Sequence, residues 1–291
     1  MELNKWWLVF ALTLASCQWF DPTAVGTSFE RQPHVYVNVA MPSDSTHCSL
    51  SMSKGLSDPS PLGGSMDACV RLQSIEGILG EGCGTGKSGA MGLWMPTSGL
   101  DNLSSGDTLA LDVTTDAWDD LSAQTTVPYA PSWSGVSLDV RTYAEGDRVF
   151  DELEVALTRG ANEDKWHLIQ LMRQVDTVAA APPKLRNLRC DDPHAVIRRH
   201  GDSMLDNGIL LGSEGWEGAE YALRFRTRNK LEVDVPYHYV VLVQSVSREL
   251  FEFWHDIEAV REGEAAVVRS NVEGATGCFG LTRTGSQLVF P

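Results

Sequence analysis

The chain of 291 residues lacks a second long apolar run, a paired-cysteine metal motif and an excess of basic charge. After residue 17 no apolar stretch approaches the roughly 20 residues that a membrane-spanning helix needs, so the rest is expected to be soluble. Lysine and arginine total 23 against 39 acidic residues, and the net charge of −16 argues against a nucleic-acid partner. Without Cys-x-x-Cys or His-x-x-x-His spacing, the sequence predicts no metal site and no cofactor.

The start of the chain has the layout of a bacterial export signal. Lys5 precedes a short apolar run, Trp6–Leu12, that is far too short to span a bilayer. The lipobox that follows consists of Leu14, Ala15, Ser16 and Cys17. We predict cleavage of a signal peptide, residues 1–16, and attachment of acyl chains to Cys17, which would anchor the protein stably to a membrane. An ordinary cleaved signal peptide and an uncleaved anchor are the alternatives.

Five cysteines remain in the mature chain, an odd number that leaves at least one thiol unpaired in an exported protein. They are Cys48, Cys69, Cys83, Cys190 and Cys278. Cys48 and Cys69 lie within alternating apolar patterns, where an unpaired cysteine behaves as a small hydrophobe. We therefore expect mostly free, buried thiols, with a Cys69–Cys83 disulfide as the alternative.

Alternation of apolar and polar residues dominates the mature chain and predicts a mainly β fold. Residues 17–30 are expected to form a tether. In residues 31–127 the alternating segments are short and separated by Gly, Pro and Ser clusters, which indicates an antiparallel β-sandwich. Two prolines within 126–131 predict a stiff linker, and alternation then resumes in a second β-rich domain, residues 132–291.

One segment has helical instead of strand periodicity. Leu250 and Trp254 lie on one face of a helix, together with further apolar residues at the same spacing. Ser247 is placed for an N-cap and Gly263 for a C-terminal stop. We predict a helix over residues 248–262, within the second domain.

Three short patterns resemble catalytic motifs but fail on spacing or order. Gly82–Ser88 lacks the first glycine of a phosphate-binding loop, so a Gly-rich surface turn is favoured. Gly201–Met204 resembles a hydrolase nucleophile block, but the Asp-x-x-His pattern lies upstream of it. Ser51–Lys54 fits Ser-x-x-Lys without any downstream Lys-Thr-Gly. We therefore predict no catalytic residue and no enzyme; a hydrolase would need a convergent acid, base and nucleophile.

A basic stripe on this acidic protein is the candidate partner-binding surface. It comprises Arg224, Arg226, Arg228 and Lys230. Cross-strand pairing with carboxylates is the alternative interpretation. The loop Leu56–Ser65 and the Gly-rich turn Gly80–Gly92 are further candidate contact elements. The cluster between Cys190 and His200 has residue types that bind zinc, but a polar loop is favoured.

The end of the chain resembles a known family. Val246–His255, followed by Arg269–Gly280, is similar to the end of the domain of unknown function 4249 family, lipoproteins mostly of Bacteroidota. Those proteins end in a helix and an "SNV-G-G-FG" signature. Ser105–Pro128 is similar to the last strands of the family's first domain, with Leu109 where Tyr is usual, and Leu153–Trp166 is a looser match. The resemblance covers nearly all the mature chain in the same order.

This resemblance implies an N-terminal immunoglobulin-like sandwich and a second β-rich domain, and it transfers no catalytic residue. The family's members are often encoded beside TonB-dependent outer-membrane receptors. We therefore expect a lipoprotein of the outer membrane, anchored through Cys17, that acts as a non-catalytic binding or accessory module with such a receptor. Gln18 is not the acidic residue that commonly retains lipoproteins in the inner membrane. A surface or periplasmic hydrolase and a purely structural envelope lipoprotein are the alternatives.

Overall fold

The residues that the computed structural model describes are 32–52, 65–87, 90–131, 133–145, 148–159, 165–175, 188–190, 195–199, 207–212, 220–227, 237–263 and 267–290. The predicted signal peptide, the lipobox with Cys17 and the tether lie outside these ranges, as do Lys54, residues 56–64, Ser88, Gly201–Met204, Arg228 and Lys230. Within the described ranges, no helix has the length and apolarity needed to cross a membrane.

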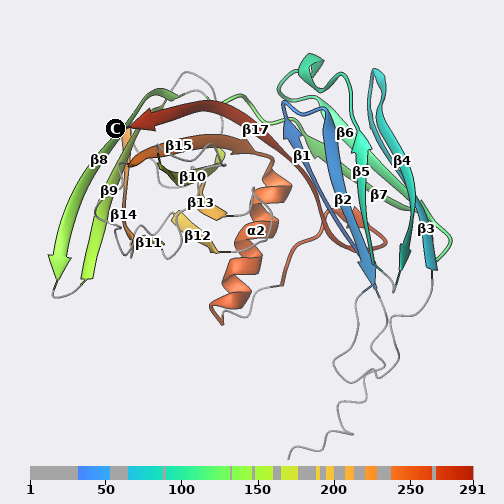
Figure 1. The fold of residues 1–291 in the computed structure, drawn as a ribbon. Coiled ribbons are helices and arrows are strands. Elements are labelled where there is room, and N and C mark those ends of the chain that lie inside the picture. The colour runs from blue at the N-terminus through green and yellow to red at the C-terminus, as the bar shows by residue number, and fades with distance from the viewer. Residues whose placement is uncertain are drawn as a thin grey trace, which may run out of the picture. The chain divides into compact units, whose positions relative to one another are not determined.

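The chain is mainly β, as the alternating pattern predicts. The strands of its first part are β1 (Pro33–Met41), β2 (Ser45–Met52), β3 (Ser65–Ser74), β4 (Gly77–Lys87), β5 (Ala90–Pro96), β6 (Thr108–Thr115) and β7 (Leu121–Thr126), with a 3-10 turn at Leu100–Asn102. They are neighbours in the order β1-β2-β5-β4-β3-β6-β7 within a thirteen-stranded sheet (Figure 1). Apolar side chains that alternate along these strands point into a single core, for example Val37, Leu72 and Leu111, each fully buried. The arrangement is sandwich-like, because strands from both ends of this order contribute to that core.

The Gly-rich segment is a strand and not a turn, so the surface-turn prediction for Gly82–Ser88 is wrong. Residues up to Lys87 belong to β4, which pairs with β3 along its length. Its ladder contact with β5 is Lys87–Ala90, and Gly80 forms an isolated bridge with Thr97, the residue after β5. A Cβ on Gly82 would lie 3.0 Å from the Met95 Cβ, so β5 side chains pack directly on the β4 backbone. Glycine at alternate positions therefore permits a close crossing between the two layers.

A second set of strands follows the segment Val127–Pro131. They are β8 (Trp133–Glu145), β9 (Arg148–Arg159), β10 (Trp166–Val175), β11 (Leu188–Cys190), β12 (Ala195–Arg199), β13 (Asn207–Gly212), β14 (Glu220–Thr227), β15 (Tyr237–Val246), β16 (Val272–Glu273) and β17 (Thr276–Phe290). Strands β11-β14-β9-β8 form a separate four-stranded sheet. Its inner side chains share a second core with β10, β13 and β15, in which Leu153, Ile169 and Val241 are fully buried.

Strand β17 pairs with β1, which lines the first core, and with β15, which lines the second. Its first part pairs in parallel with β1, from His34–Thr276 to Met41–Arg283. Its last part pairs antiparallel with β15, from Val246–Thr282 to Tyr239–Phe290. The C-terminal strand thus joins residues from both sides of the expected 126–131 boundary in one sheet, and the division of the chain into two domains stays a prediction.

Helix α2 (Arg248–Arg261) matches the predicted helix over 248–262 within one residue. Its apolar face buries Leu250, Phe253 and Trp254 in a third cluster, together with Cys278 of β17. Ser247 is the N-cap residue, as predicted, but its side chain makes no hydrogen bond to the helix. Its hydroxyl instead accepts the N–H of Leu281 at 3.1 Å, which fastens the start of α2 to β17.

Candidate functional site

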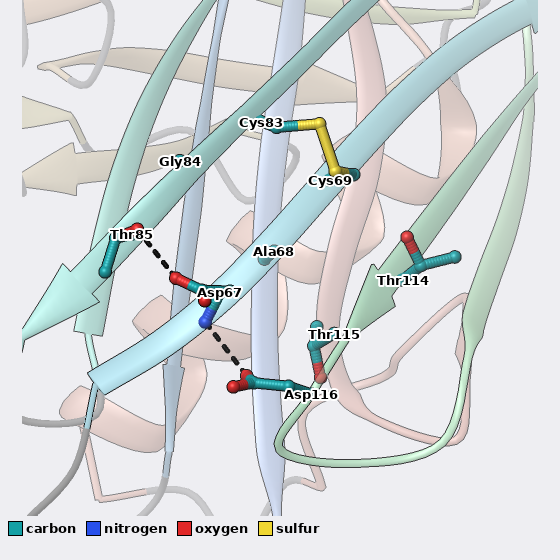
Figure 2. Close-up of a pocket in the computed structure, with 9 residues that line it drawn as sticks. All are labelled: Asp67, Ala68, Cys69, Cys83, Gly84, Thr85, Thr114, Thr115 and Asp116. Atoms are coloured by element: carbon teal, nitrogen blue, oxygen red, sulfur yellow. Dashed lines mark hydrogen bonds between the residues drawn. A yellow bond between two sulfur atoms is a disulfide. The ribbon is translucent and has the colours of Figure 1, made fainter.

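An open depression of about 600 Å³ lies on the outward side of β3, β4 and β6. It is lined by Asp67, Ala68, Cys69, Cys83, Gly84, Thr85, Thr114, Thr115 and Asp116 (Figure 2). Its polar side chains project from strands whose opposite faces supply the first core, since neighbouring residues of a strand point to opposite faces. The alternation that buries one face of these strands therefore also exposes the polar side chains of the depression.

A disulfide between Cys69 and Cys83, with Cα atoms 4.1 Å apart, lines the depression. The two residues lie opposite one another on adjacent antiparallel strands. The expectation of free thiols is wrong for this pair, and the alternative pairing is confirmed. Cys69 alternates with Ala68 and Val70, which are the buried positions, so its side chain points outward toward Cys83.

Cys48 and Cys278 are buried reduced cysteines, as expected, whereas the Cys190 side chain lies outside the described structure. Burial raises the pKa of the Cys48 thiol to about 12. Because the thiolate is the reactive form, Cys48 is chemically inert at neutral pH and serves as a packing residue.

Two aspartates and a threonine form the rim of the depression. The Thr85 hydroxyl donates to Asp67 Oδ1 at 2.6 Å, and the Asp67 N–H donates to Asp116 Oδ1 at 2.9 Å (Figure 2). The Asp116 N–H in turn donates to the Asp67 carbonyl at 3.2 Å. These bonds tie the outer ends of β3, β4 and the turn after β6 together. The result is a rigid, open surface rich in hydrogen-bond acceptors.

The one basic-stripe side chain that the structure describes takes part in a cross-strand ion pair. Arg224 lies opposite Glu154 on β9, and its Nε is 2.7 Å from Glu154 Oε2. The Arg224 side chain is 73 % exposed, so the pair contributes little stability. Arg226 lies opposite Glu152 in the same register. The described residues thus support the pairing interpretation of the stripe.

The serine of the Ser-x-x-Lys pattern lies in regular sheet. Ser51 pairs with His34 of β1 and with Ala90 of β5. The Ser51 backbone is therefore part of two strand ladders. In hydrolases the nucleophilic serine lies instead on a strained turn.

Asn271, in the C-terminal signature, forms a set of hydrogen bonds that we call the latch, and no sequence pattern predicts them. The Asn271 amide accepts the Phe279 N–H at 2.9 Å and donates to the Phe279 carbonyl at 2.8 Å. It also donates to the Gln124 carbonyl at 3.0 Å. Asn271 thereby joins β17 to β7 along a part of β17 that does not pair with β15. A Cβ at Gly277, whose φ is +130°, would collide with the Val35 carbonyl, which explains a glycine there.

An ion pair holds the segment before this latch against α2. Arg269 binds Asp256 through its backbone N–H at 2.9 Å, its Nε at 2.8 Å and its Nη2 at 2.7 Å. The hydrogen bonds from Arg269 hold the pKa of the Asp256 carboxyl below its ordinary value. The helical pattern of the sequence places Asp256 on α2, but it does not indicate that Arg269, 13 residues later, is its partner; only the folded structure shows this pair.

An exposed aromatic pair lies on the other side of the first core. The Trp94 side chain on β5 is 69 % exposed. Its ring lies 4.8 Å from the ring of His47, with a tilt of 46°. The two residues are partners in the β2–β5 ladder. The alternation of β5 could have predicted the exposure of Trp94, because Trp94 lies between Leu93 and Met95, which point inward.

The chain matches no family model, and no curated protein matches it. Among solved structures it is similar to the Fcho1 Mu homology domain of Danio rerio, determined with a bound Eps15 peptide. The likeness has a TM-score of 0.21 and 9 % sequence identity, and it covers 89 % of this chain and 94 % of that chain. At this TM-score the likeness carries no argument about fold or function.

Proposed function

We propose that the protein is a lipid-anchored component of the cell envelope that acts as a non-catalytic binding or accessory module. The observation that carries this proposal is the lipobox ending at Cys17, which directs export and acylation. The Cys69–Cys83 disulfide supports it independently, because such bonds persist in oxidising compartments outside the cytoplasm.

The geometry also supports binding. The Cys69–Cys83 depression is open, and the carboxylates of Asp67 and Asp116 accept hydrogen bonds from neighbouring hydroxyl and N–H groups. Rigid strands present these groups, and such a surface suits recognition through hydrogen bonds.

We further propose that the partner is a TonB-dependent outer-membrane receptor, with the protein held at the outer membrane through its lipid. The support is the resemblance stated for the C-terminal signature, whose family is often encoded beside such receptors. Sandwich edges and loops bind partners without active-site chemistry.

An affinity pull-down tests this function. The full-length tagged protein is recovered from detergent-solubilised outer membranes of its own bacterium, and the Cys17→Ala variant is the matched control. We expect a TonB-dependent β-barrel at near-equal stoichiometry with the wild type and little with the variant. Recovery of only peptidoglycan-associated proteins, or of nothing, would contradict the proposal.

A further inference from the structure

The outward side of β1, β2 and β5 carries the Trp94–His47 pair and lies apart from the Cys69–Cys83 depression. Because Val35, Cys48 and Met91 point into the first core, the residues between them point outward. The pairing registers place these outward residues in three rows. The rows are Trp94, His47, Asn38; Gly92, Ser49, Tyr36; and Ala90, Ser51, His34. We call this surface the Trp94 face, and β1, β2 and β5 can be followed in Figure 1.

No member of the Trp94 face is Asp, Glu, Lys or Arg, on a chain with 62 such residues. Its open polar groups are the hydroxyls of Ser49 and Ser51 and the imidazole of His47, whereas the Asn38 amide nitrogen is buried. Burial lowers the pKa of His34, which favours its neutral form. With β-sheet spacings of about 4.8 Å between strands and about 6.7 Å between outward residues of one strand, the three rows on three strands span about 10 Å by about 13 Å.

Trp94 is held in place although it is exposed. A Cβ on Gly92 would lie 3.1 Å from His47 Nε2, so the imidazole leans over the position where Gly92 has no side chain. The indole packs against the same imidazole. An ordered, exposed tryptophan supplies a large contact area at a low cost in conformational entropy on binding.

The face ends at α2. The Tyr36 ring lies 6.0 Å from the Phe253 ring, and its hydroxyl accepts the Trp254 Nε1–H at 3.3 Å. The helix therefore covers the β1 side, while Trp94, Gly92 and the serines of β2 remain on the open side.

We propose that the Trp94 face binds a neutral polysaccharide. An indole face stacks on the C–H groups of a pyranose ring, and hydroxyl and imidazole groups beside it match sugar hydroxyls. The absence of charge complements a neutral chain, whereas the net charge of −16 repels anionic ligands. A protein interface would favour a larger apolar centre than one tryptophan among serines and glycine provides.

This inference names a ligand for the proposed binding module and rests on that function. The two fail separately, because recovery of the β-barrel depends on Cys17 and glycan binding on Trp94. If Trp94→Ala removes glycan binding and the barrel is still recovered, both statements hold; if glycan binding is absent and the barrel is recovered, only the glycan inference is wrong.

The test is affinity electrophoresis of the full-length detergent-solubilised protein in native gels containing dextran, laminarin or galactomannan. With a pI of about 4.8 the protein migrates well at neutral pH, and retardation beyond that of a non-binding reference protein in the same gel reports binding. We expect at least one of them to retard the wild type, and Trp94→Ala to bind about tenfold more weakly. His47→Ala should be intermediate. Ile75→Ala, which alters a side chain that is 97 % exposed in the β3–β4 turn, should match the wild type.

Unchanged mobility of the wild type in all three polysaccharides would overturn the inference, and so would equal retardation of wild type and Trp94→Ala. Sedimentation provides the remaining check. If Trp94→Ala converts a dimer to a monomer while no polysaccharide retards the wild type, the face joins two copies of the chain and the glycan inference is wrong.

Discussion

Replacing Asn271 with alanine should loosen the attachment of the C-terminal strand to β7. The side chain makes two hydrogen bonds to the backbone of Phe279 and one to the Gln124 carbonyl. In effect the amide substitutes for a neighbouring strand at this point of β17, because it satisfies both the N–H and the carbonyl of one residue.

The magnitude follows from the burial of Phe279, which has 0 % exposure. Each bond to Phe279 is worth about 1 kcal/mol net, and a buried N–H left without a partner adds a desolvation cost, so we expect a loss of about 2–3 kcal/mol in the free energy of unfolding. At about 2–4 °C per kcal/mol for a chain of this size, the melting temperature should fall by about 5–10 °C.

Thermal unfolding and amide hydrogen exchange measure this effect together. Exchange at the Phe279 amide should accelerate strongly in Asn271→Ala, while amides in the β8–β9 pair keep their rates. Asn102→Ala, at an exposed position of the 3-10 turn, is the matched control and should change the melting temperature by about 1–2 °C at most. An unchanged melting temperature or unchanged exchange at Phe279 would refute the latch.

Three further predictions concern other contacts. The double variant Cys69→Ser/Cys83→Ser should lose about 3 kcal/mol, given a sequence separation of 14, and a reductant should lower the wild-type melting temperature to the same value. A variant that melts like the oxidised wild type would contradict this. Arg269→Ala should destabilise the protein at neutral pH, because Asp256 is only 7 % exposed and loses its partner. Since the folded-state pKa of Asp256 is lowered, its stabilising contribution is present above pH 4 and disappears as the pH falls through that pKa, so the wild-type and variant melting temperatures should converge below pH 4; a constant gap would contradict this. Gly280→Ala should cost about 1–3 kcal/mol in denaturant unfolding, because its Cβ would lie 2.5 Å from a side chain of α2, and an unchanged transition would show that the helix yields freely.

Local patterns predicted the features that depend on neighbours in sequence. Alternation identified strands such as β1, β2, β3 and β6, and a period of 3.6 residues identified α2, because burial of one face imposes one of these two periods. The buried faces of β1 and β2, which carry Val37 and Leu50, and the bounds of α2 were predicted in this way. The lipobox prediction depends on the sequence alone.

Features that depend on which strands become neighbours could not be predicted. Cys69 fits either a buried thiol or a disulfide until β3 and β4 are placed in register. Glycines in β4 resemble a turn until β5 is seen to cross them. Ser247 is the N-cap residue that the sequence predicts, but its hydroxyl accepts an N–H of β17 in place of one from the helix. In each case a contact distant in sequence decides between two locally reasonable interpretations.

Metabolic labelling with a clickable fatty acid tests the central claim, that the protein is exported and anchored through Cys17, most directly. Wild type and Cys17→Ala are expressed in the native bacterium, and the purified proteins are compared for label and for intact mass. The account predicts a labelled wild type that lacks residues 1–16 and carries acyl chains, and an unlabelled variant. Equal labelling of both proteins, or a wild type without lipid, would contradict it.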